Sequence, residues 1–266
     1  MKGKWIKMQI LSIPYNNIQI FFLIFLRIAS ISMSMPLFES SNVPMIFKIG
    51  LAFTISIAIY PIVPKFSNII DMEICDFIVG AIGEVILGLI IGYSIRLVFT
   101  GIQLGGQTAG NQMGFGLSRV IDPVSGSEAN AISQFYNLTA ILIFFAINAH
   151  HIFLKGIVES FRIVPILNFN FSGPIMLYII KLFSGMFIIA VKIGSPLIVA
   201  LLLTSVSLGL VARTVPQMNI FIVALPIKIL GGIIFLGFCI PYIRYFIDSA
   251  FNSLGNDIYI ILNLSK

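Results

Sequence analysis

"LTAILIFFAINA", residues 138–149, decides the fold. Strands of a membrane barrel are about ten residues long, and they alternate apolar with polar side chains because one face meets lipid and the other the lumen. This stretch is mostly apolar and lacks that alternation. Inside hydrocarbon, such a run satisfies its own backbone hydrogen bonds only as a helix. We therefore predict an all-α integral membrane protein.

Similar apolar runs recur along the whole chain. Hydrophobic residues make up 58% of the sequence and charged residues 10%, with a mean hydropathy of +1.05. Because about 20 apolar residues in a helix cross the hydrocarbon core, we expect about six long hydrophobic helices arranged as hairpins. No repeat or linker divides them, so residues 1–266 are treated as a single membrane-embedded unit. The expected spans are residues 18–37, 46–64, 77–100, 129–152, 176–212 (interrupted, as two shorter helices) and 220–247.

Several function classes find no support in the remaining residues. The net charge is +6, but no basic patch is interleaved with aromatic residues, so nucleic-acid binding is not expected. Cys75 and Cys239 are isolated, and the neighbouring His150 and His151 would point about 100° apart on a helix, which makes a poor metal site. The sequence has no phosphate-binding loop, no H-E-x-x-H motif and no serine paired with a base. We predict no enzyme activity, cofactor or metal.

Charges within the apolar runs are a stronger signal. Each would cost about 2.5–3.5 kcal/mol at the centre of a bilayer, so each is expected to face protein or water unless it reaches the interface from a run end. A proton-coupled transporter needs acidic relay residues, and Glu84 alone fits that role. The full set is Arg27, Glu84, Arg96, Lys181, Lys192 and Lys228.

A glycine-rich segment, "GGQTAGNQMGFGLSRVIDPVSGSE" (residues 105–128), separates two apolar runs. Gly106, Gly110 and Gly114 repeat every four residues, so a helical form would present a flat strip for close backbone approach. Gln103, Gln107 and Asn111 would form an amide stripe beside this strip. Glycine also makes a helix labile, and we favour a loop folded into a pore. A turn at the membrane surface is the alternative.

Met113 and Phe115 would supply the bulky apolar contacts that close such a pore. The segment ends at Asp122 and Pro123, a turn signal. Ser125 and Glu128 then have capping-box spacing, which predicts a helix start near residue 126.

A second loop, "LVARTVPQMNIF" (residues 210–221), divides the last two runs. Thr214 and Gln217 have capping-box spacing with Pro216 between them, which predicts a helix start near residue 215.

An ordered series of motifs over residues 18–250 resembles the FliR/SctT family, which builds the export gate of flagellar and injectisome type III secretion. The most specific of them is "ARTVPQMN" placed before "PIK". The series comprises "GFGLSRVIDP" (114–123), "ISQFYNL" (132–138), "NAHH" (148–151), "ESFRIVP" (159–165), "SLGLVARTVPQMNIF" (207–221) and "LPIKILGG" (225–232).

The resemblance implies a role in the bacterial cytoplasmic membrane, at the flagellar basal body. Members assemble with FliP- and FliQ-like subunits, pair with an FlhB-like switch protein, and surround unfolded protein substrates in transit; their hairpins rise partly out of the lipid. The family's plug loop maps onto the glycine-rich segment, at Gly114, Phe115, Asp122 and Pro123. Residues in and after the second loop would have structural packing roles, namely Arg213, Pro216, Gln217, Asn219 and Lys228.

Two other functions remain open on sequence grounds. An autonomous small-solute permease should show inverted repeats or paired broken helices. An intramembrane enzyme should show a nucleophile with its base, or a metal triad. Neither pattern is evident in the sequence.

Overall fold

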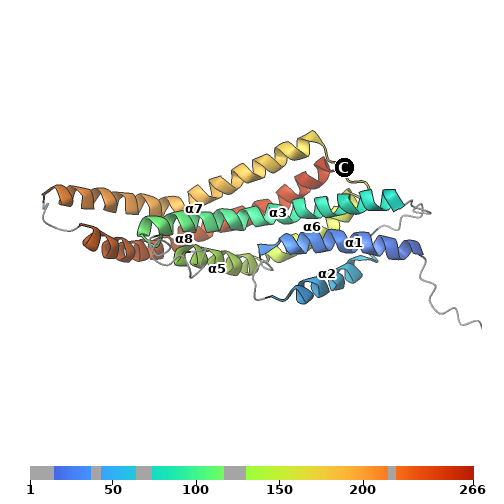
Figure 1. The fold of residues 1–266 in the computed structure, drawn as a ribbon, viewed down its shortest axis with the longest axis horizontal. Helices are drawn as coiled ribbons and strands as arrows, with labels where there is room; N and C mark the ends of the chain where they lie inside the picture. The colour runs from blue at the N-terminus through green and yellow to red at the C-terminus, as the bar shows by residue number, and fades with distance from the viewer. Residues whose placement is uncertain (1–14, 37–42, 64–73, 117–129, 215–219) are drawn as a thin grey trace, which may run out of the picture.

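The structure, a computed structural model, describes residues 15–36, 43–63, 74–116, 130–214 and 220–266. These residues form an elongated bundle of helices without strands, as the sequence predicts (Figure 1). The helices are α1 (Tyr15–Ser34), α2 (Met45–Ile59), α3 (Ile74–Met113), α5 (Ala131–Ala146), α6 (Ala149–Ile163), α7 (Gly173–Thr214) and α8 (Ile220–Leu264).

All six predicted apolar runs contain helix, but fewer than six are suited to span a membrane. Among the described residues α1, α3, α7 and α8 are long and apolar enough, and the bent pair α5–α6 would be a fifth. α2 has 15 residues, and its length of about 22 Å is less than the hydrocarbon thickness of about 30 Å. The prediction of about six spans was therefore approximate.

α7 and α8 are longer than the runs predicted for them. α7 is one continuous helix of 42 residues with Pro196 inside it, so the predicted interruption was wrong. α8 has 45 residues and contains Pro226 and Pro241. At 1.5 Å per residue these helices are about 63 and 68 Å long. Figure 1 shows them extending together past the end of α3.

The predicted span 129–152 is broken. α5 and α6 meet at an angle of 71°. Asn148, between them, has a φ of 57°, a left-handed conformation that asparagine adopts more readily than most residues. One left-handed residue cannot continue a right-handed helix, which explains the bend.

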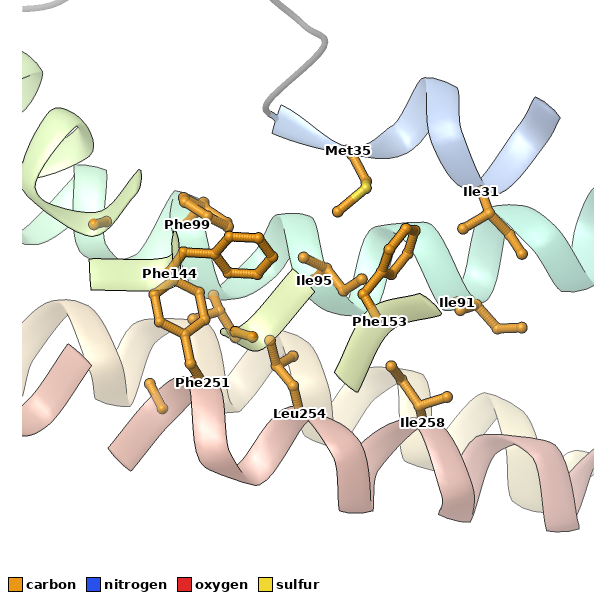
Figure 2. Packing of buried hydrophobic residues seen from close by; sticks show 14 of the residues in the cluster. Ile31, Met35, Ile91, Ile95, Phe99, Phe144, Phe153, Phe251, Leu254 and Ile258 are labelled. Carbon is orange, nitrogen blue, oxygen red and sulfur yellow. The ribbon is translucent and has the colours of Figure 1, made fainter. Parts of the chain in front are cut away.

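α3 lies at the centre of the bundle and contacts α1, α5, α7 and α8 (Figure 1). In its middle, Phe99 meets Phe144 of α5 and Phe251 of α8 (Figure 2), with ring centroids 5.7 and 5.1 Å away. All three rings are nearly inaccessible to solvent. Buried aromatic pairs at this spacing stabilise a core beyond the area that they bury. The core thus joins three separate parts of the chain around α3.

Two glycines of the stretch "GLIIG", residues 88–92, let α1 lie directly against α3. A Cβ built at Gly88 would lie 2.7 Å from the carbonyl oxygen of Arg27, and one at Gly92 would lie 2.8 Å from that of Ile31. Both contacts advance by four residues along both helices, so α1 and α3 run in the same direction. A side chain at either glycine would force the helices apart.

Candidate functional site

The glycine-rich segment is helical as far as Met113, the last residue of α3. The predicted pore loop from Gly105 is therefore wrong for residues 105–113. The helical form suggested by the glycine spacing is the one observed. The reason is packing, because glycines of this part of α3 touch neighbouring helices on two sides.

The first side faces α7. A Cβ built at Gly101 would lie 2.7 Å from the carbonyl oxygen of Met186, and one at Gly105 would lie 2.8 Å from that of Ala190. These are backbone atoms of a helix, which cannot move aside as a flexible side chain can. Packing of this kind, which compensates for the low helix propensity of glycine, requires the absence of a side chain at both positions.

The second side faces the start of α5. A Cβ built at Gly106 would lie 3.0 Å from the Cα of Ser133, and one at Gly110 would lie 2.8 Å from the Cγ of Asn130. From Gly106 to Gly110 the residue numbers rise along α3, while those of the contacted residues fall from Ser133 to Asn130, so α3 and α5 are antiparallel here. Gly106 and Gly110, both predicted as site residues, thus hold α5 against α3.

Polar groups fix the start of α5 to α3, mainly through backbone oxygens of α3 and with one side chain of the predicted amide stripe, that of Asn111. Asn130 Nδ2 donates to the backbone oxygen of Gln107 at 3.1 Å and lies 3.4 Å from Asn111 Oδ1. Asn130 Oδ1 accepts from the backbone N–H of Ser133 at 2.7 Å, which makes Asn130 the N-cap of α5. Ser133 Oγ donates to the backbone oxygen of Gln103 at 3.1 Å.

This cap corrects one predicted boundary. α5 begins at Ala131 rather than near residue 126, because Asn130 has an extended backbone and caps the helix. The proposed capping box, Ser125 and Glu128, lies outside the described residues.

α3 ends in a two-bond turn. The N–H of Gly114 donates to the oxygen of Asn111, and the N–H of Phe115 donates to that of Gly110, both at 3.1 Å. Gly114 has a φ of +103°, which L-residues rarely adopt. This is the Schellman arrangement, in which glycine ends a helix by satisfying its last carbonyls.

Met113 lies against α8 rather than facing an opening. Its side chain is fully buried, and a Cβ built at Gly232 of α8 would lie 2.6 Å from Met113 Cε. A Cβ at Gly114 would likewise lie 2.6 Å from Leu225 Cδ2. Phe115 is half-buried against the core. The end of α3 is therefore seated on the first half of α8.

Of the other predicted site residues, the structure describes two. Arg213 is exposed in the last turn of α7, and Lys228 is half-buried in α8. The remaining ones lie outside the described residues: Asp122, Pro123, Pro216, Gln217 and Asn219. The described part of α8 begins at Ile220, after the predicted start near residue 215.

A buried ion pair holds the opposite half of the bundle, and its pairing was not predicted. Arg27 of α1 and Glu84 of α3 are both fully buried. Arg27 Nε donates to Glu84 Oε2, and Arg27 Nη2 donates to Glu84 Oε1 at 2.9 Å. The two parallel bonds give this pair both strength and a fixed orientation.

The same guanidinium caps the end of α6. Arg27 Nη1 donates to the carbonyl oxygens of Ser160 at 3.0 Å and Val164 at 2.9 Å. Val164 is the C-cap residue of α6, and the carbonyl oxygen of Ser160 also accepts the N–H of Val164, at 3.0 Å. Glu84 Oε1 also accepts from the backbone N–H of Leu167, at 3.0 Å. Arg27 thus faces protein, as expected for a charge within an apolar run, and all of these partners belong to this chain.

Among the residues that the structure describes, no group of three His, Cys, Asp or Glu side chains could hold a metal ion. What the geometry provides is a helix end held on three sides, by α5, α7 and α8, from which the chain continues into residues 117–129.

Comparison with known proteins is consistent with this arrangement. The sequence model of the bacterial export proteins, family 1, matches residues 18–254. The flagellar biosynthetic protein FliR of Bacillus subtilis (strain 168) is 35% identical over 236 residues, which cover 87% of this chain and 90% of that protein. FliR of Escherichia coli (strain K12) is 27% identical over 90% of this chain and 91% of its own. FliR of Aquifex aeolicus (strain VF5) is 29% identical over a region that covers 85% of this chain and 87% of that protein. The chain is a multi-pass membrane protein that belongs to the FliR family of bacterial export proteins, components of flagellar biosynthesis.

Proposed function

We propose that this chain is a structural, non-enzymatic subunit of the flagellar protein export gate. It would lie in the bacterial cytoplasmic membrane, at the basal body, and assemble with FliP-, FliQ- and FlhB-like subunits around the path of unfolded substrates. The segment from Gly114 to residue 129 would act as the plug that closes this path at rest.

One observation carries the plug assignment. The turn at Gly114 ends α3, and Asn130 returns to the same helix end through Asn111 and Gln107. Residues 117–129 therefore leave and rejoin the bundle at one place. A segment with both ends fixed can be displaced by a passing chain and still return, without rearrangement of the helices that carry it.

The seating of Met113 refines the way in which such a plug would close. Met113 would act by anchoring the base of the plug on Gly232, because its side chain is buried there. Phe115, which is half-buried and is the first large apolar residue after the helix end, would then help to exclude water from a constriction.

The first test is membrane conductance in cells that carry the partner subunits. Replacing residues 117–129 by a short Gly-Ser linker should raise ion leakage while protein export continues. The same replacement of residues 64–73, another connection between helices, is the matched control and should leave the membrane tight.

The second test is crosslinking, in a chain whose Cys75 and Cys239 are changed to alanine. A Ser118→Cys variant should crosslink to an export substrate stalled in transit. If the linker variant is assembled but tight, and Ser118→Cys never meets substrate, residues 117–129 are a surface turn. If the chain alone moves a small solute in vesicles, it is an autonomous permease instead.

A further inference from the structure

A groove of about 290 Å³ lies between α3, α7 and α8. Its lining combines apolar side chains with two lysines of α7, Lys181 and Lys192, and one carboxylate of α8, Asp257. The lysines are 11 residues apart, so they lie on the same face of α7, about 16 Å from each other along the helix. Both lysine side chains are exposed. The groove therefore presents two separate cations to the outside of the chain.

The Lys181 end of the groove has a negative charge of its own. The Tyr178 hydroxyl donates a hydrogen bond of 2.8 Å to Asp257 Oδ1. Lys181 Nζ lies 5.5 Å from the centroid of the same tyrosine ring. Tyr178 therefore contacts both charged residues, and Asp257 offsets the charge of Lys181 from within this chain.

The Lys192 end lacks such a carboxylate. Lys192 Nζ lies 5.9 Å from the centroid of the Phe246 ring of α8. Asp257 follows Phe246 by 11 residues, which puts it about 16 Å away along α8. Asp248 is closer in sequence, but it lies about 200° round the helix from Phe246 and does not line the groove. Among the described residues no carboxylate oxygen lies within 4.0 Å of the Lys192 ammonium.

The surface next to Lys192 is apolar. Ile188 and Val191 of α7 and Tyr245 of α8 are each more than half exposed. α7 is also one of the helices long and apolar enough to span a membrane. Charged residues in such helices normally face protein and pair there, because an unpaired charge among apolar groups is costly. Lys192 therefore lacks an anion that its surroundings call for.

The groove has room for another helix to approach. Gly185 lines it two turns before Lys192 on the same face, and a Cβ built at Gly185 would meet no atom within 4 Å. A glycine that is open in this way permits close approach of a neighbouring backbone, which a helix provides and a lipid chain does not need. A volume of about 290 Å³ is small even for a ligand pocket, and it suits one or two inserted side chains.

We propose that a helix of a neighbouring subunit lies along this face of α7 and places an aspartate or glutamate carboxylate beside the Lys192 ammonium. The inference rests on the proposed function, which supplies the neighbouring export-gate subunit. Lys181 is the matched control, because it shares the helix face, the groove and the exposure of Lys192 but has Asp257 at its own end.

The experiment uses the full chain, affinity-tagged and purified from cells that carry the partner subunits. Carbodiimide joins an amine to a carboxylate only when the two are in contact, and peptide mass spectrometry identifies the coupled residues. Lys192 should couple to an aspartate or glutamate of a partner subunit.

Substitutions then measure what the contact contributes. Lys192→Gln should lower the recovery of the coupled partner at least about tenfold, as expected when one member of a covered charge pair is removed. Lys192→Arg and Lys181→Gln should keep the recovery of the parent chain. Lys192→Glu, combined with lysine in place of the coupled carboxylate of the partner, should restore recovery, which a misfolded variant would not do.

Three results would overturn the inference while leaving the export-gate function intact: parental recovery of partners by Lys192→Gln, an equal loss in Lys181→Gln, or coupling of Lys192 only to carboxylates of this chain. Loss of bound anionic phospholipid instead of a partner subunit in Lys192→Gln would also overturn it, since the occupant would then be lipid. If the parent chain recovers no partner subunit, the proposed function fails, and this inference fails with it.

Discussion

Arg27 Nη2 and Glu84 Oε1 lie 2.9 Å apart, with both side chains fully buried between α1 and α3. Four N–H groups of the guanidinium are used, two by the carboxylate and two by the end of α6. The pair therefore positions three helices that are far apart in the sequence. Removal of either partner leaves the other charge buried without compensation.

We expect Arg27→Met and Glu84→Gln each to lower the free energy of unfolding by about 3–5 kcal/mol, the usual cost of a broken buried pair. The double variant Arg27→Met with Glu84→Leu should recover much of the Glu84→Gln loss, because no buried charge remains. Denaturation of the purified assembly in mixed micelles measures both effects.

Arg162 provides the control for this prediction. It pairs with Glu159 at 3.1 Å on the surface, where its side chain is 59% exposed. Arg162→Ala should change the free energy of unfolding by less than about 1 kcal/mol. If Arg27→Met has an effect as small as Arg162→Ala, the buried pair does not organise the fold.

Gly105→Ala should prevent the close approach of α3 and α7. The added methyl group would meet the carbonyl oxygen of Ala190 at 2.8 Å, and both atoms belong to rigid helices. We expect reduced accumulation of the protein and loss of swimming on soft agar. Gly209→Ala, where a built Cβ would meet no atom of another described helix within 4 Å, should be tolerated. Wild-type accumulation of Gly105→Ala would mean that α3 and α7 are not in direct backbone contact.

Met113 and Gly232 should behave as a coupled pair. Gly232→Ala places a methyl group 2.6 Å from Met113 Cε and should destabilise the end of α3. The shorter side chain of Met113→Ala makes room for that methyl group, so the double variant should be more stable than Gly232→Ala alone. A double-mutant cycle on thermal stability in detergent measures the coupling, and additive effects would show that the two residues do not touch.

The chain should depend on partner subunits for its accumulation. Large apolar side chains on the hairpin of α7 and α8 are well exposed, including Leu203 at 65%, Ile222 at 70% and Phe238 at 78%. Pulse-chase labelling should show rapid degradation of the chain produced alone and persistence when partner subunits are co-produced. A monodisperse chain obtained alone in mild detergent would contradict this expectation.

Periodicity predicted the helical class and the positions of the apolar runs, because those depend on local sequence. The four-residue spacing of glycines also indicated close helix packing, but it did not indicate which helices would pack against α3. The loop predicted from Gly105 was wrong because glycine propensity is a local property, whereas contacts with Met186 and Ala190 are tertiary. The glycine-rich segment could be located in the sequence, but the helices that it contacts could not be identified from it.

The pairing of Arg27 with Glu84 illustrates the same limit. Both charges stand out in apolar runs, and their opposite signs were visible. Their separation of 57 residues, however, is bridged only when α1 and α3 pack in the same direction. The bend at Asn148 escaped prediction as well, because a single left-handed residue leaves no periodic signal in the sequence.

α7 and α8 are too long to lie wholly within the hydrocarbon layer of a membrane, and this bears on how the chain would contact its neighbours. Confining about 63 Å of α7 to a hydrocarbon layer of about 30 Å would need a tilt near 60°, well beyond the usual range of 0–40°. Part of the hairpin must therefore lie outside lipid, yet its side chains are apolar on exposed faces there. Water would make that position unfavourable, and another apolar protein surface would make it favourable. If the partner subunits of the proposed export gate provide that surface, departure from the bilayer and binding of neighbours would be one coupled equilibrium.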